Sequence, residues 1–120
     1  MAIVGIGTDI VKIERIARAI NRKRFLDVCY TADEIEYCKR AGKFAPLKFA
    51  GYFAAKESVA KALGVGFLGF YPRDIEICHD EMGCPKIKLS AKVKIAQCKK
   101  IWVSISHEKE FATAVAIIEV

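Results

Sequence analysis

The spacing of hydrophobic residues divides the chain into a helical first half and a strand-rich second half. The opening segment IVGIG is rich in β-branched residues and glycine, which predicts a strand that ends near Asp9. Apolar residues then recur at intervals of three and four from Ile10 to about Asn21. Thr31 with Glu34 forms a capping-box pattern that starts a second helix, and a third helix starts near Pro46 and ends at Gly64. The chain is therefore expected to form three helices, over residues 10–21, 31–42 and 46–64.

The spacing changes to alternation after the glycine-rich stretch at 64–69. Apolar and charged residues alternate over 74–77 and 86–89, on either side of an MGCP turn, which predicts a hairpin. Ser90 is suited to cap a short helix through Cys98. Residues 101–105 alternate again, 107–110 are typical of a hairpin turn, and ATAVAIIEV predicts a strand in the centre of a sheet. This order predicts an α+β fold in one domain, residues 1–120, with an antiparallel-rich sheet against the long helix.

Charged residues interrupt the apolar side of the 46–64 helix. At 100° per residue, the predicted buried stripe consists of Phe53, Val59, Ala60 and Leu63. Lys56 points into the middle of that stripe, and Glu57 and Lys61 lie along its border, one turn apart. A plain ion pair between Glu57 and Lys61 is one explanation. The other is a functional site that needs charge beside the core.

Composition narrows the class of protein. A chain of 120 residues, 53% hydrophobic, has the length for one modest core. No apolar run approaches the ~18–20 residues of a membrane span, and the N-terminus lacks signal-peptide features, so we expect a cytoplasmic protein. Five cysteines without a CxxC pair favour reduced thiols, most of them acting as small apolar residues. The spacing of Cys78, His79 and Cys84 matches no common zinc site.

The net charge of +6 is concentrated in one segment. Between Lys12 and Arg24 there are six basic residues and one acidic residue. Such a patch favours an acidic partner, either nucleic acid or an acidic protein surface, although an ordinary solvated helix face has the same composition. The short chain also leaves sheet edges to cover, which favours association between identical subunits.

Asp9, Glu57 and Lys61 form a candidate phosphate-chemistry site. Asp9 taken alone is explained by a helix cap, but Glu57 in the middle of a helix is not. Two carboxylates from separate elements suit Mg²⁺, which fills its coordination with water and phosphate oxygens, and a lysine supplies a point charge for the phosphate.

Two other motifs are weaker. The glycines Gly64, Gly66 and Gly69 spell GxGxxG, but the motif follows a predicted helix rather than a strand, which excludes a dinucleotide-binding turn. Their backbone amides remain suited to approach a phosphate. In SISHEKEFA, Ser106 and His107 are adjacent on a strand and point to opposite sides, which argues against a hydrolase triad. His107 at a strand end is expected to contact a phosphate or to order the hairpin.

These residues together resemble the 4′-phosphopantetheinyl transferases, whose two motifs stand here as Gly7-Thr8-Asp9 and as FAAKESVAK from Phe53 to Lys61. The chain is similar to the short single-domain members, the holo-acyl-carrier-protein synthases, over nearly its whole length. The similarity includes GIGTDIVKIERI, YTADEIEYC, GVGF, RDIEI with GCPKIKL, and SISHEKEFATAVAII.

The resemblance implies transfer of the phosphopantetheine arm of coenzyme A to a serine of apo-acyl carrier protein, with release of adenosine 3′,5′-bisphosphate. It implies that Asp9 and Glu57 bind Mg²⁺, that Lys61 neutralises the phosphates, and that His107 lies near coenzyme A. Gly64 and Gly66 are then expected to line the nucleotide end. Glu57 is the leading candidate for the general base. Lys56 is expected to span the apolar stripe with its methylenes and pair with a carboxylate behind the site.

The resemblance further implies a homotrimer with sites at subunit interfaces and a basic first helix that docks the carrier protein through Arg15, Arg22 and Arg24. A role in fatty-acid biosynthesis follows by family analogy, and the particular carrier is left open. One position departs from the family pattern: Tyr52 follows Gly51 where many members have arginine, so Lys43 or Lys48 would have to supply that charge.

Two alternative functions, from other classes of protein, are also compatible with parts of the sequence. A nucleic-acid-binding protein would use the Lys12–Arg24 segment, although that segment has few aromatics for stacking and the site carboxylates would repel phosphates. An inactive structural trimer would follow if Tyr52 abolished coenzyme A binding.

Overall fold

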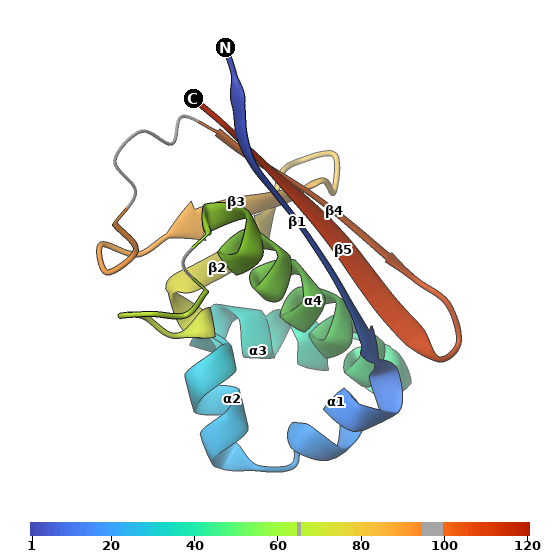
Figure 1. Cartoon of the computed structure of the whole chain (residues 1–120). Coiled ribbons are helices and arrows are strands. Elements are labelled where there is room, and N and C mark those ends of the chain that lie inside the picture. The colour runs from blue at the N-terminus through green and yellow to red at the C-terminus, as the bar shows by residue number, and fades with distance from the viewer. Residues whose placement is uncertain (65, 95–99) are drawn as a thin grey trace.

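The computed structural model describes residues 1–64, 66–94 and 100–120 and places two antiparallel sheets around one long helix (Figure 1). The predicted α+β fold class is confirmed. In chain order the elements are β1 (Ile3–Lys12), α1 (Ile13–Ala19), α2 (Lys23–Cys29), α3 (Ala32–Lys39), a 3₁₀ turn η1 (Gly42–Phe44), α4 (Ala45–Leu63), a second 3₁₀ turn η2 (Pro72–Asp74), β2 (Ile75–His79), β3 (Pro85–Leu89), β4 (Lys100–His107) and β5 (Phe111–Glu119).

The strands form two separate sheets rather than one. The larger sheet has the order β1-β5-β4, and β2 and β3 pair in a hairpin of their own. The C-terminal strand β5 lies in the centre of the larger sheet, as its continuous apolar sequence predicts. Figure 1 shows the two chain ends at the same end of this sheet, where the backbones of Ala2 and Val120 exchange hydrogen bonds of 3.1 and 2.9 Å.

Helix α4 begins and ends close to the predicted residues. Pro46 lies in its first turn, and Gly64 caps its C-terminus with a φ of 80°, a left-handed conformation that favours glycine. The predicted one-sided stripe is wrong, however, because residues 49–56, 58–60 and 62 are all buried. The larger sheet packs against one side of α4, and α1, α3 and β2 pack around the rest. A helix in the centre of a small domain has almost no solvent face.

The N-terminal boundary also differs from the prediction. Strand β1 continues to Lys12, because Ile10 and Val11 pair with Thr113 and Ala112 of β5. The predicted end of the strand near Asp9 and the predicted helix start at Ile10 are therefore wrong, and Asp9 does not cap a helix. The isoleucine spacing fits a helix locally, but pairing with a strand about 100 residues away decides the structure.

Helix α2 was not among the predicted helices, because its seven residues are too few to show a helical period. Helix α3 starts as predicted, with a complete capping box. The Thr31 hydroxyl accepts the Glu34 N–H at 3.2 Å, and the Glu34 carboxylate accepts the Thr31 N–H at 2.8 Å. The predicted helix from Ser90 is not formed in its described part, since 91–93 make a turn and the Ser90 hydroxyl accepts the Lys92 N–H. Residues 95–99 of that prediction lie outside the described residues.

Of the cysteines, Cys29 and Cys38 are buried in the core, as expected for small apolar residues. Cys78 and Cys84 are exposed on the β2–β3 hairpin, and Cys98 is outside the described residues. In the part of the chain that the structure describes, no helix combines the length and apolarity needed to cross a membrane.

Candidate active site

Asp9 and Lys61 meet where β1 crosses the last turns of α4. The Lys61 ammonium donates to the Thr8 carbonyl at 2.9 Å and contacts Asp9 Oδ1 at 3.2 Å. Gly7 permits this approach, because a Cβ there would overlap the Ser58 carbonyl oxygen and lie 2.8 Å from the Ala62 nitrogen. The glycine two residues before the aspartate therefore sets how closely β1 packs on α4.

Glu57 lies half-buried on α4 beside this ion pair. Burial raises the pKa of the Glu57 carboxyl, and the negative charge of Asp9 adds to the rise, while Lys61 and Arg15 oppose it. The three residues predicted as a site are thus brought together. The alternative of a plain Glu57–Lys61 ion pair is wrong, since the salt bridge of Lys61 in the described chain is with Asp9.

This donor set fits a magnesium ion better than a metal that is held by protein ligands alone. The described residues contain no group of three or more histidine, cysteine, aspartate or glutamate side chains that could hold a metal. Two neighbouring carboxylates, Asp9 and Glu57, are the ligands that suit Mg²⁺ when water and phosphate oxygens complete its coordination.

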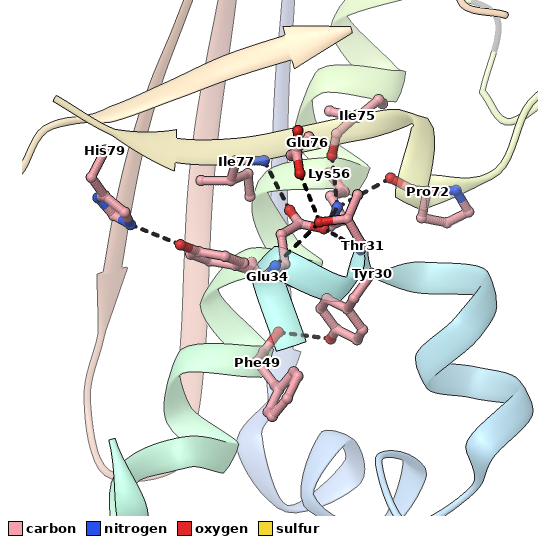
Figure 2. A network of polar contacts seen from close by, with 11 residues as sticks. Tyr30, Thr31, Glu34, Phe49, Lys56, Pro72, Ile75, Glu76, Ile77 and His79 are labelled. Atoms are coloured by element: carbon pink, nitrogen blue, oxygen red, sulfur yellow. Dashed lines mark hydrogen bonds and ion pairs between the residues drawn. The ribbon is translucent and has the colours of Figure 1, made fainter. Parts of the chain in front are cut away.

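Lys56 faces a different direction, into the centre of the molecule (Figure 2). Its ammonium lies 2.7 Å from Glu34 Oε1 and donates to the carbonyls of Ile75 and Pro72 at 2.6 and 3.2 Å. The other carboxylate oxygen of Glu34 accepts the Ile77 N–H at 2.8 Å. Burial lowers the pKa of the Lys56 ammonium, and Glu34 opposes that shift. The predicted buried pairing of Lys56 is confirmed, and it joins α4, α3 and β2 behind Glu57.

His107 lies elsewhere, at the end of β4. It lines a pocket of about 480 Å³ between α4, the β2–β3 hairpin and β4, and Asp9, Glu57 and Lys61 are not among the residues of its wall. Strands β1 and β4 flank β5, so two strand spacings, about 10 Å, separate the strand of Asp9 from that of His107. Within one chain, the predicted site therefore falls into two parts.

Tyr52 forms part of the wall of this pocket. Its hydroxyl lies 2.8 Å from His79 Nε2, and His79 Nδ1 lies 3.2 Å from the Gly83 carbonyl. Because that carbonyl can only accept, Nδ1 carries the proton and Nε2 accepts from Tyr52. Tyr37 stacks on both rings, at 5.6 Å from Tyr52 and 4.8 Å from His79. At the position where the family pattern has arginine, this chain therefore has a neutral tyrosine that is hydrogen-bonded to His79 and forms part of the pocket wall.

The cations near this pocket differ in part from those expected. Lys48 lines the pocket, whereas the ammonium of Lys43 lies over the Phe44 ring at 5.2 Å. Lys86 also lines the pocket, and sequence reasoning missed it together with Tyr37 and His79. The sequence placed these residues on a predicted helix and a predicted hairpin, but it did not indicate that those elements pack around one pocket.

The glycine loop begins directly after the site. The N–H of Gly64 donates to the Lys61 carbonyl at 3.0 Å, and Gly64, Gly66 and Gly69 all have positive φ. The motif follows a helix, so the structure agrees with the rejection of a dinucleotide-binding turn.

The sequence suggested that Arg15, Arg22 and Arg24 lie on one basic helix, but the structure places them on two helices and the turn between them. Arg15 is on α1, with its guanidinium 5.6 Å from the Phe53 ring centre, whereas Arg22 precedes α2 and Arg24 lies within it. Phe53 is one helical turn before Glu57, so Arg15 is the one of these three arginines that lies beside the carboxylate cluster of Asp9 and Glu57.

Comparison with known proteins identifies the family. The family model of the 4′-phosphopantetheinyl transferase superfamily matches residues 5–116. The holo-[acyl-carrier-protein] synthase of Clostridium novyi (strain NT) is 51% identical over 123 aligned residues, which cover 98% of this chain and 88% of that protein.

Solved structures show the same fold. The Helicobacter pylori holo-[acyl-carrier-protein] synthase in complex with coenzyme A superposes with a TM-score of 0.84 at 36% identity, covering 95% of this chain and 99% of that one. The Bacillus anthracis enzyme in complex with CoA (3′,5′-ADP) has a TM-score of 0.83 at 35% identity, covering 98% and 96%. The chain therefore belongs to the 4′-phosphopantetheinyl transferase superfamily and, within it, to the holo-[acyl-carrier-protein] synthase family of enzymes.

Proposed function

We propose that this enzyme transfers 4′-phosphopantetheine from coenzyme A to a serine hydroxyl of an apo-acyl carrier protein, in a Mg²⁺-dependent reaction that releases adenosine 3′,5′-bisphosphate. The observation that carries the proposal is the meeting of Asp9, Glu57 and Lys61 at the crossing of β1 and α4. The relatives that act as holo-[acyl-carrier-protein] synthases, two of them with coenzyme A bound, support the choice of substrates.

In this reaction the serine oxygen bonds to the phosphorus that carries the pantetheine arm. The pyrophosphate bridge breaks, and its oxygen leaves with the adenosine bisphosphate. Lys61 stabilises the negative charge of the phosphates, and Glu57 accepts the serine proton. Asp9 and Glu57 would hold the Mg²⁺, which supplies charge stabilisation when bound. Gly64 and Gly66 line the nucleotide end, where a Cβ at either position would meet no other atom within 4 Å.

We also propose that the enzyme works as a homotrimer whose sites lie between subunits. The outer face of the larger sheet exposes apolar side chains, with Ile6, Ile10 and Trp102 at 66%, 65% and 46% exposure, which favours burial between copies. The separation of the pocket with His107 from the carboxylate cluster also favours a shared site. Each subunit would be one domain, residues 1–120, and would contribute one half-site to each of two shared sites. We propose that the enzyme acts in the cytoplasm, in fatty-acid biosynthesis.

The test is the intact mass of an apo-acyl carrier protein after incubation with enzyme, coenzyme A and Mg²⁺. We expect a gain of one phosphopantetheine per carrier, lost with EDTA and lost in a folded Glu57→Gln variant. An unchanged carrier mass with the wild-type enzyme, across several carriers, would refute the proposed activity. An equal gain with EDTA would refute the role of the metal.

The shared site has its own test. Glu57→Gln and His107→Ala each remove one half-site, and sedimentation should show that each variant still forms trimers. After unfolding and refolding as a mixture, some interfaces would pair an intact Glu57 with an intact His107, so activity should reappear. Persistent inactivity of well-formed mixed trimers would mean that both residues act from the same chain.

A further inference from the structure

His79 is a titratable residue that has no role in the transfer chemistry proposed above. It is half-buried at the end of β2, and it lines the pocket of about 480 Å³ that also contains His107. Its ring is held on three sides. The Tyr52 hydroxyl lies 2.8 Å from Nε2, the Gly83 carbonyl lies 3.2 Å from Nδ1, and the Tyr37 ring stacks on the imidazole at 4.8 Å.

Both nitrogens of the His79 ring face an oxygen atom that is able to accept a hydrogen bond. In the neutral ring, Nδ1 donates to the Gly83 carbonyl and Nε2 accepts from the Tyr52 hydroxyl. Burial raises the pKa of the Tyr52 phenol, so this hydroxyl keeps its proton and can serve as donor or acceptor. If Nε2 gains a proton, the hydroxyl only has to rotate, and its own O–H becomes free to donate to a group in the pocket. The site can therefore hold either charge state of the ring without moving a heavy atom.

The other titratable side chains in the pocket wall are mostly basic. Lys48 comes from α4, Lys86 from β3 and His107 from β4, and the wall also contains the phenol of Tyr37 and the thiol of Cys84. None of the described residues in this wall is acidic. The pocket is therefore suited to an anionic ligand, because basic side chains meet the ligand and no carboxylate repels it.

The acidic residues on the segments next to His79 have partners of their own. Asp80 accepts two backbone N–H groups of its own turn at 2.9 Å and lies 3.7 Å from the Lys86 ammonium. Glu34 of α3 is paired with Lys56. The described hydrogen bonds of the His79 ring lead to a phenol and a carbonyl, both uncharged. A positive charge on this ring would therefore be balanced by an anionic ligand.

Coenzyme A carries phosphate at two places, and only one of them reacts. The pyrophosphate bridge has to lie at the carboxylate cluster, because one of its phosphorus atoms is attacked. The 3′-phosphate of the ribose takes no part in the bond changes and is largely a dianion at neutral pH. In the shared site proposed above, the pocket with His107 is the half that lacks the reacting groups. The 3′-phosphate is therefore the anion that this pocket can receive.

We propose that His79 is a specificity-determining residue that takes up a proton from solvent when coenzyme A binds and holds the 3′-phosphate as an imidazolium. The inference rests on the proposed function and deepens it. Histidine is the side chain that ordinarily changes charge between about pH 5 and 8, and a dianion beside the ring favours the charged form. The imidazolium supplies positive charge that the neutral Tyr52 cannot. Affinity for coenzyme A should therefore fall as the pH rises, whereas affinity for 3′-dephospho-coenzyme A should change much less.

The test is titration calorimetry of the enzyme with coenzyme A at about pH 7, in two buffers of different ionisation enthalpy, which counts the protons taken up on binding. We expect proton uptake by wild type with coenzyme A, and far less with 3′-dephospho-coenzyme A or with His79→Gln. In steady-state kinetics, the KM for coenzyme A should rise about fivefold more in wild type than in His79→Gln between about pH 6.5 and 8.5. The ratio of the two kcat values should stay constant over this range.

A second variant and a control complete the design. His79→Lys carries a charge that does not titrate in this range, so its KM should stay low at both pH values and its binding should take up no extra proton. Because His79 packs on Tyr37, circular dichroism has to show that each variant is folded, and His79→Lys carries the test if His79→Gln is not. The control is Arg40→Gln, an exposed arginine of α3 paired with Glu36, which should keep the wild-type proton uptake.

The outcomes separate this inference from the proposed function. Equal proton uptake with coenzyme A and 3′-dephospho-coenzyme A would overturn the inference, because the 3′-phosphate would not be the cause. Uptake that persists in the folded variants would also overturn it and would assign the proton to another group, such as His107. If wild type modifies the carrier but binds coenzyme A without proton uptake, the inference alone fails. If wild type shows the His79-dependent uptake but modifies no carrier, the proposed function fails and the role of His79 in binding is retained.

Discussion

The buried Lys56–Glu34 pair should be the most sensitive point of the fold, and Lys56→Met is the change that tests it. Both side chains are completely buried and their charged atoms are 2.7 Å apart. Methionine preserves the length of the side chain but leaves the Glu34 carboxylate without its cation and the Ile75 carbonyl without the ammonium that donates to it, whereas the Pro72 carbonyl still accepts the Ile75 N–H.

The expected loss follows from these contacts. Removing one member of a buried ion pair costs about 3–5 kcal/mol, because the remaining charge cannot be solvated. That is a large fraction of the ~5–15 kcal/mol by which small proteins are stable. The exposed Arg40–Glu36 pair has a similar geometry, at 2.9 Å, but because water screens it, Arg40→Gln should cost below about 1 kcal/mol.

Urea denaturation, followed by circular dichroism, measures both changes. The double variant Lys56→Met/Glu34→Gln should be less destabilised than the sum of the single variants, since it no longer buries an unpaired charge. A loss below about 1 kcal/mol for Lys56→Met, or strict additivity in the double variant, would refute the electrostatic reasoning. Because the pair fixes β2, which carries His79 into the pocket, Lys56→Met should also raise the KM for coenzyme A.

Three further changes test the site. Glu57→Gln should abolish transfer yet raise Tm near neutral pH. A carboxyl with a raised pKa stabilises the fold below its ordinary pKa, and this contribution is lost as the pH rises through the raised value. Calorimetry with and without Mg²⁺ should show a metal-dependent Tm in wild type only. Gly7→Ala should lower both stability, by about 1–3 kcal/mol, and transfer, because its Cβ pushes β1 and Asp9 away from α4; unchanged activity would mean that this packing does not position Asp9. Tyr52→Arg places a guanidinium in the pocket and should lower the KM for coenzyme A. The lost stacking on Tyr37 should cost about 1 kcal/mol of stability. A raised KM would argue that the aromatic wall itself binds the nucleotide.

Local chemistry was sufficient for much of the secondary structure. The capping box at Thr31, the stop at Gly64 and the hairpin strands around 75–89 depend on contacts within a few residues, and each was predicted from the sequence. The family motifs likewise grouped Asp9, Glu57 and Lys61 as one candidate site, and the structure brings the three residues together. These features are carried by residue type and spacing, so no knowledge of the fold was needed to find them.

Only the tertiary structure determined which partners those residues have. Long-range pairing with β5 extended β1 past Asp9, and the central position of α4 buried it on nearly all sides. Lys61 could have paired with Glu57 on its own helix, but the close packing that Gly7 allows brings Asp9 to it instead. The pocket wall of Tyr37, Tyr52 and His79 joins three elements that are distant in sequence. Spacing along the chain specifies which side chains share a face, but the packing of separate elements decides what each face meets.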